Sequence, residues 1–182
     1  ATHLITAFLT FSYTFWILLS LIFPEKKRFN KLLYKSSLIL FFVVILQIIY
    51  GAFVAGLDAG QIYNTWPKMY DKWIAESVYA MTPIWKNFLY GLSGVQFVHR
   101  YLALIITLIM LFIYIKAKKI ELSTIENNVI NILAMIILLQ ILIGIFTLIY
   151  GVPIWLGIIH QLCAFLLLAA TVFSLFIFKK PT

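Results

Sequence analysis

The sequence predicts an all-α, polytopic membrane protein with about five transmembrane helices. Of its 182 residues, 64% are hydrophobic and only 11% are charged, which is less than half of the roughly 25% charge of a typical soluble domain. The apolar residues also form long blocks of roughly twenty residues, the length that crosses a hydrocarbon core of about 30 Å. Because unpaired backbone polar groups are costly in lipid, such blocks are expected to be helices.

Proline, glycine and charged residues separate the apolar blocks and set the expected elements in order. Pro24 ends the first block, and a basic segment follows it. A long loop of mixed composition comes after the second block, and a short turn with Pro153 joins the last two. The five helices are expected at residues 3–23, 36–56, 95–115, 128–150 and 157–178. Residues 1–35 thus form one helix with its loop, and residues 36–182 form an antiparallel four-helix bundle with an outer loop at 57–94.

The basic residues predict the orientation of the chain in the membrane. Lysine and arginine are concentrated in the loops on the cytoplasmic or matrix side of membrane proteins. Ten of the 14 basic residues fall on one predicted side, together with the C-terminus: Lys26, Lys27, Arg28, Lys31, Lys35, Lys116, Lys118, Lys119, Lys179 and Lys180. The net charge of +8 is therefore explained by topology. The expected partner is a lipid bilayer, and no nucleic acid is expected.

The three histidines occupy equivalent places in this topology. His3, His99 and His160 each lie near the start of a helix that runs inward from the outer surface, so all three are expected at a similar depth. Each is followed four residues later, on the same helix face, by an alanine: Ala7, Ala103 and Ala164. A small residue one turn below an imidazole leaves room for a flat macrocycle.

Two histidines on facing helices of a four-helix bundle are a suitable site for bis-histidine haem ligation. His99 and His160 are expected to form this pair. A structural role is the alternative for any single interfacial histidine. Zinc is a weaker candidate, because it prefers three or four ligands at close spacing, and no cysteine or carboxylate cluster accompanies these histidines.

A weak internal repeat places a glutamine and a glycine on the helix before each of these two histidines. Gln47 and Gly51 precede His99, and Gln140 and Gly144 precede His160 at the same internal spacing. Polar groups in mid-membrane are often functional, so both glutamines are candidate cofactor-binding residues; the alternative is that they only bridge helices by hydrogen bonds.

Three further features complete the residue-level interpretation. Arg100, next to His99, is the expected partner of a haem propionate. Cys163, the single cysteine, is expected to fill space in the core, with no role assigned. The chain begins with Ala1 and enters an apolar block at once, without a signal peptide, so we expect it to be a piece of a longer protein.

Several segments together resemble the haem A synthase family, in the form shared by alphaproteobacteria and mitochondria, over essentially all of residues 1–182. They are Gly51-Ala-Phe-Val-Ala-Gly-Leu-Asp-Ala-Gly60, Tyr63-Asn-Thr-Trp-Pro67, Val95-Gln-Phe-Val-His-Arg100, Gln140 to Leu148, and His160-Gln161. The tyrosine-containing loop combined with the two histidine helices is specific, whereas each segment alone would be weak.

The resemblance implies an eight-helix protein with two similar halves, each of which offers a histidine pair. This chain would be the last helix of the first half, followed by the whole second half. His99 and His160 would be the axial iron ligands of a b-type haem, and His3 would be one iron ligand of the substrate, haem O. A glutamate essential to the chemistry would lie upstream, so the catalytic residue is unknown here and this piece alone is expected to be inactive.

The implied reaction of the full protein is oxidation of the C8 methyl group of haem O to a formyl group. The product, haem A, serves cytochrome c oxidase. The resemblance implies a bacterial inner membrane or the mitochondrial inner membrane, with haem O synthase as a candidate partner; a homo-oligomer is also compatible with the sequence. Two alternatives stay open: a membrane cytochrome b that only carries electrons, and a transporter or assembly factor without a cofactor. The latter should bury charges in mid-helix, where the sequence places none beyond Arg100.

Overall fold

The computed structural model describes residues 2–23 and 29–180, and within them the prediction of an all-α fold is confirmed. Five helices there are long and apolar enough to cross a membrane. They are α1 (Thr2–Ile22), α2 (Lys31–Gly56), α4 (Leu92–Ala117), α5 (Thr124–Ile149) and α6 (Ile154–Phe178). Pro24 and three of the basic residues used for the orientation, Lys26, Lys27 and Arg28, lie outside the described residues.

Four helices begin three to five residues before the positions expected from the sequence, and polar side chains cap two of them, α2 and α5. The Asn30 side chain accepts a hydrogen bond of 3.0 Å from the Leu33 N–H at the start of α2. Ser123 and Glu126 form a reciprocal capping box at the start of α5. Capping residues satisfy the free N–H groups of the first helical turn, so hydrophobicity alone places these boundaries too late.

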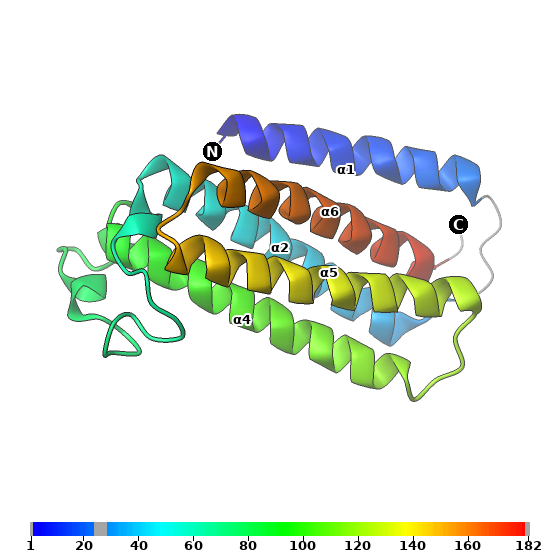
Figure 1. The fold of residues 1–182 in the computed structure, drawn as a ribbon. Coiled ribbons are helices and arrows are strands. Elements are labelled where there is room, and N and C mark those ends of the chain that lie inside the picture. The colour runs from blue at the N-terminus through cyan, green and yellow to red at the C-terminus, as the bar shows by residue number, and fades with distance from the viewer. Residues whose placement is uncertain (1, 24–28, 181–182) are drawn as a thin grey trace.

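Four of the helices, α2, α4, α5 and α6, form an antiparallel bundle, and α1 runs along the outside of α6 (Figure 1). The bundle core is mostly aliphatic, with the fully buried side chains of Leu33, Leu40, Ile113, Leu133 and Leu168, and it also buries Phe176 and Phe178. Within it, a hydrogen bond of 2.8 Å between the Ser37 and Ser174 hydroxyls joins α2 to α6. Aromatic pairs attach α1 to α6: Phe11–Phe165 with ring centroids 4.3 Å apart and Trp16–Phe176 at 5.3 Å.

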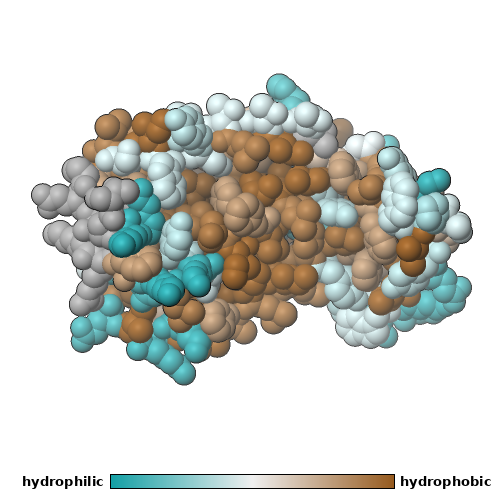
Figure 2. Space-filling model, turned by 180° about the vertical axis from the view of Figure 1, so that it is seen from behind, coloured by the Kyte–Doolittle hydropathy of each residue, from teal (hydrophilic) through white to brown (hydrophobic). Residues whose placement is uncertain are grey.

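On the face shown in Figure 2, the middle of the molecule is hydrophobic, and hydrophilic residues gather toward the two ends. We call the end formed by residues 57–91 and 150–153 the loop end, and the end formed by 116–123 and 179–180 the basic end. The first residues of α1, α4 and α6 all lie at the loop end (Figure 1). The predicted placement of His3, His99 and His160 at one end of the bundle is therefore confirmed.

The loop between α2 and α4 is folded rather than irregular. It contains two short 3₁₀ helices, η1 (Ala59–Gln61) and η2 (Glu76–Tyr79), and a single-turn helix, α3 (Trp85–Leu89). Met69 and Val78 form its own small core. Asn87 is fully buried: its side-chain oxygen accepts from the Met81 N–H at 2.8 Å, and its amide donates to the carbonyls of Met81 and Ile84, both at 2.9 Å.

We predict that Asn87→Ala destabilises the protein by about 1–3 kcal/mol, because three hydrogen bonds are lost and their backbone partners are left unpaired. Reversible unfolding in detergent measures this change. The control is Asn128→Ala, which changes an exposed asparagine and should shift stability by less than about 0.5 kcal/mol. Equal stability of the two variants would contradict a structural role for Asn87.

Candidate functional site: a paired-histidine site in the bundle

His99 on α4 and His160 on α6 lie opposite each other near the loop end of the bundle. Their ring centroids are 6.5 Å apart, and the ring planes make an angle of 74°. Both residues are half-buried, and the Nδ1 atom of each ring is inaccessible to solvent and makes no hydrogen bond of good geometry. The structure thus brings together the two histidines that the sequence paired.

Each imidazole is held by the glutamine of the preceding long helix. The distance from Gln47 Nε2 to His99 Nε2 is 3.4 Å, and that from Gln140 Nε2 to His160 Nε2 is 3.3 Å. The Oε1 atoms of both glutamines are buried and have no hydrogen-bond partner. Both glutamines therefore lie in the site itself, and each contacts its histidine through the same atom.

A glycine on the same helix lets each imidazole approach the helix backbone. A Cβ atom added at Gly51 would lie 3.2 Å from His99 Cε1, and one added at Gly144 would lie 2.9 Å from His160 Cε1. Both distances are shorter than ordinary contacts between carbon atoms. Each glycine follows its glutamine by four residues, which puts the two on one helix face. The repeat in the sequence is thus a repeated contact in space.

Arg100 points toward the folded loop and is buried. Its guanidinium donates to three loop carbonyls, those of Tyr63 at 2.5 Å, Thr65 at 3.0 Å and Lys68 at 3.3 Å. It also donates to Gln96 Oε1 at 3.2 Å. These contacts could not be predicted from the sequence, because nothing local to Arg100 relates it to carbonyls more than thirty residues away. A propionate contact for Arg100 stays a prediction.

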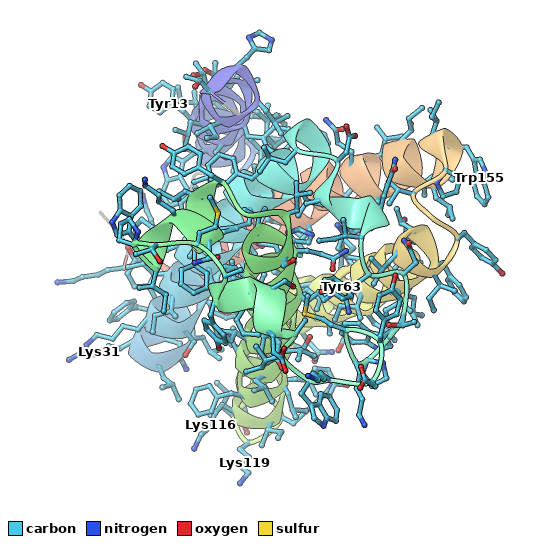
Figure 3. The ribbon with its side chains drawn as sticks, turned by 90° about the vertical axis from the view of Figure 1, so that its left-hand side faces the viewer. Tyr13, Lys31, Tyr63, Lys116, Lys119 and Trp155 are labelled. Atoms are coloured by element: carbon cyan, nitrogen blue, oxygen red, sulfur yellow. The ribbon has the colours of Figure 1, made fainter. Side chains whose placement is uncertain are left out.

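The loop is also fastened to the other half of the bundle. The Asn64 amide donates to the Leu148 carbonyl on α5 at 2.8 Å and to the Gly60 carbonyl at 3.0 Å. In a view onto the loop end, Tyr63 lies near the centre, whereas Trp155 points away at the rim (Figure 3). Asn64 was missed as a functional candidate, although its place in the Tyr-Asn-Thr-Trp-Pro segment was a usable signal.

His3 takes no part in this arrangement. Its side chain is exposed at the start of α1, and α1 contacts the bundle mainly through α6. Cys163 is a buried free cysteine on α6, in agreement with its expected place in the core. Of the three predicted iron ligands, the structure therefore brings two together and leaves the third apart.

The paired histidines fit a haem better than a zinc ion. A bis-histidine haem needs only two protein ligands, and the structure brings two imidazoles to a centroid distance of 6.5 Å. The site also has two unpartnered Nδ1 atoms. Each imidazole, in addition, packs closely against a glycine, Gly51 or Gly144. Among the described residues, no group of three or more His, Cys, Asp or Glu side chains converges.

The fold and the site define a class: polytopic all-α membrane proteins with a paired-histidine site inside a four-helix bundle. The profile of the COX15-CtaA family, described as cytochrome oxidase assembly protein, matches residues 1–172. The chain belongs to this family, which is the haem A synthase family, and the resemblance seen in the sequence is confirmed.

Curated relatives named "Heme A synthase" match nearly the whole chain. The relative from Flavobacterium psychrophilum is 47% identical over 98% of this chain and 53% of its own length. That from Flavobacterium johnsoniae is 46% identical over 95% and 52%, and that from Beijerinckia indica is 38% identical over 94% and 49%. The chain thus spans about half the length of the relatives that it matches. No solved structure matches it.

We predict that Gly144→Ala destabilises the protein by about 1–3 kcal/mol, because the new methyl group would push His160 away from α5. Gly51→Ala should cost less, since its added Cβ has a longer contact. The matched control is Gly157→Ala, where a Cβ meets nothing within 4 Å and the substitution should be neutral or stabilising by about 0.5–1 kcal/mol. Unfolding in detergent measures the stability of the three variants. If Gly157→Ala were the least stable of them, the tight contacts between the glycines and the histidines would be contradicted.

We predict that Arg100→Met releases the loop from α4, because three carbonyls lose their charged donor. Hydrogen bonds to charged groups contribute about 1.5–3 kcal/mol, so amide hydrogen exchange across residues 63–70 should accelerate about tenfold or more. Lys35→Met removes an exposed basic residue of α2 and serves as the control. Unchanged exchange in the Arg100 variant would mean that other contacts hold the loop.

Proposed function

We propose that this chain holds a b-type haem between His99 and His160 and provides the electron-transfer half of a haem A synthase. The observation that carries the proposal is the pair of facing imidazoles, each supported by the same glutamine and glycine. The relatives named "Heme A synthase" support the assignment to haem A biosynthesis. The full protein would oxidise the C8 methyl group of haem O to a formyl group, giving haem A for cytochrome c oxidase.

A haem bound there supplies one-electron chemistry through its iron, and the chain's residues set the conditions for it. His99 and His160 would each hold the haem through one ring nitrogen. Gly51 and Gly144 let the rings lie against α2 and α5, which fixes their orientation. The loop held by Arg100 and Asn64 covers the loop end of the bundle, where haem propionates are expected, and Arg100 is a buried cation at that end.

The remaining parts of the assignment follow from the family. His3 would be one ligand of the substrate haem O, at a site separate from the b-type haem; its exposed side chain on α1 is consistent with that separation. We assign no catalytic residue to residues 1–182. The protein would lie in a bacterial or mitochondrial inner membrane, with the basic end and the C-terminus on the cytoplasmic or matrix side.

The second candidate function is a membrane cytochrome b that only carries electrons. It is favoured by the fact that the described residues assemble a single histidine pair, with His3 apart from it. Both functions predict bis-histidine haem at His99 and His160. They differ in whether haem O binds at a second site that includes His3, so titration of the full-length protein with haem O separates them.

We predict that His99→Ala and His160→Ala each abolish the reduced-minus-oxidised difference spectrum of a low-spin haem in the purified chain, since each removes one axial ligand. His3→Ala is the matched control and should retain the spectrum. A spectrum retained in both site variants would overturn the proposal. Loss of the spectrum in the His3 variant would mean that the histidines are wrongly paired.

A further inference from the structure

Four buried polar atoms near the histidine pair lack hydrogen bonds: Gln47 Oε1, His99 Nδ1, Gln140 Oε1 and His160 Nδ1. They form two equivalent sets, one between α2 and α4 and one between α5 and α6. In each set the glutamine amide nitrogen faces the Nε2 atom of the histidine. An arrangement made twice from different residues points to a defined role for the glutamines.

The chemistry of the two groups fixes the direction of each hydrogen bond. An amide nitrogen is only a donor, so Nε2 of the imidazole has to accept with its lone pair, and the ring proton has to reside on Nδ1. The reverse amide orientation would leave the two N–H groups of each NH₂ buried without acceptors. In the observed orientation one of these N–H groups donates to the ring, and the proton on Nδ1 is left without an acceptor.

We propose that Gln47 and Gln140 are caps of the two iron-binding nitrogens in the cofactor-free protein. Each amide occupies the Nε2 lone pair that haem iron uses, and it holds the ring in the tautomer that can ligate iron through that atom. Binding of haem breaks both amide–imidazole hydrogen bonds. This inference rests on the proposed haem site and adds to it a competition between protein amide and iron for the same electron pair.

Replacing a capping glutamine should change the affinity for haem in the opposite direction to replacing a glutamine that supports bound haem. With an apolar residue in its place, the cofactor-free imidazole keeps an unpaired, buried Nε2, and the iron no longer competes with an amide. Since a typical hydrogen bond contributes about 1 kcal/mol net and 1.4 kcal/mol is tenfold in affinity, removal of one cap should tighten haem binding about fivefold. A glutamine that supports the bound haem would have the opposite effect.

The first experiment needs no haem. The chain is labelled with ¹⁵N-histidine, purified haem-free in detergent, and the ring nitrogens are examined by NMR. In the wild-type protein, His99 and His160 should both carry the proton on Nδ1. Gln47→Leu should change the ring signals of His99 and leave those of His160, and Gln140→Leu should do the reverse. Each variant thus contains its own control, and Gln61→Leu, at an exposed position, should change neither.

The second experiment titrates the same haem-free proteins with ferric protoporphyrin IX. Gln47→Leu and Gln140→Leu should each bind about fivefold more tightly than wild type, and the double variant about 25-fold more tightly if the two caps act independently. Gln61→Leu should bind like wild type.

The two readouts separate failure of the cap from failure of the haem site. Protonated Nε2 in the wild type, or unchanged ring signals in the leucine variants, would overturn the cap. Unchanged or weaker porphyrin binding by those variants would also overturn it, while the haem site itself would stand. Ring signals that shift as expected, with no porphyrin bound by any protein, would confirm the amide–imidazole bonds and overturn the proposed haem site.

Discussion

The close approach of an imidazole to a helix backbone is the constraint on which the site depends. His160 lies so near α5 that even a methyl group at Gly144 would be 2.9 Å from its ring, and His99 meets α2 at Gly51 in the same way. Glycine inside a helix destabilises it by roughly 0.5–1 kcal/mol relative to alanine. Its presence at both contacts is explained by the imidazole, which leaves too little space for a Cβ atom. The four-residue spacing then brings Gln47 and Gln140 onto the same faces, where they reach the ring nitrogens.

Arg100 fixes the loop end by a different principle. A guanidinium taken out of water needs its N–H groups satisfied, and loop carbonyls together with one side-chain oxygen meet most of that need. The adjacent residue, His99, points into the bundle, because successive residues on a helix are separated by about 100°. Neighbours in the sequence therefore serve two structures, the paired-histidine site and the loop above it, and the loop shape depends on a residue of α4.

The sequence predicted what depends on hydrophobicity and short spacing. The five spans, the shared depth of the histidines and the pairing of His99 with His160 all follow from apolar blocks and helix direction. Helix starts were wrong by several residues where Asn30 and Ser123 extend α2 and α5 by capping, although the Ser-x-x-Glu pattern was readable. The contacts of Arg100 and Asn64 could not be predicted, because they join residues 35 and 84 positions apart through backbone carbonyls, which every residue carries.

The packing of α1 explains why His3 stands apart from the other histidines. On α6, Phe165 and Phe176, which contact α1, lie about 140° and about 160° around the helix from His160. The face of α6 that holds α1 is therefore nearly opposite the face that presents the imidazole to α4 and α5. A ligand at His3 and one at His160 would lie on different sides of α6. Helix α6 thus uses two nearly opposite faces, one to pack against α1 and one to present His160 to the paired-histidine site.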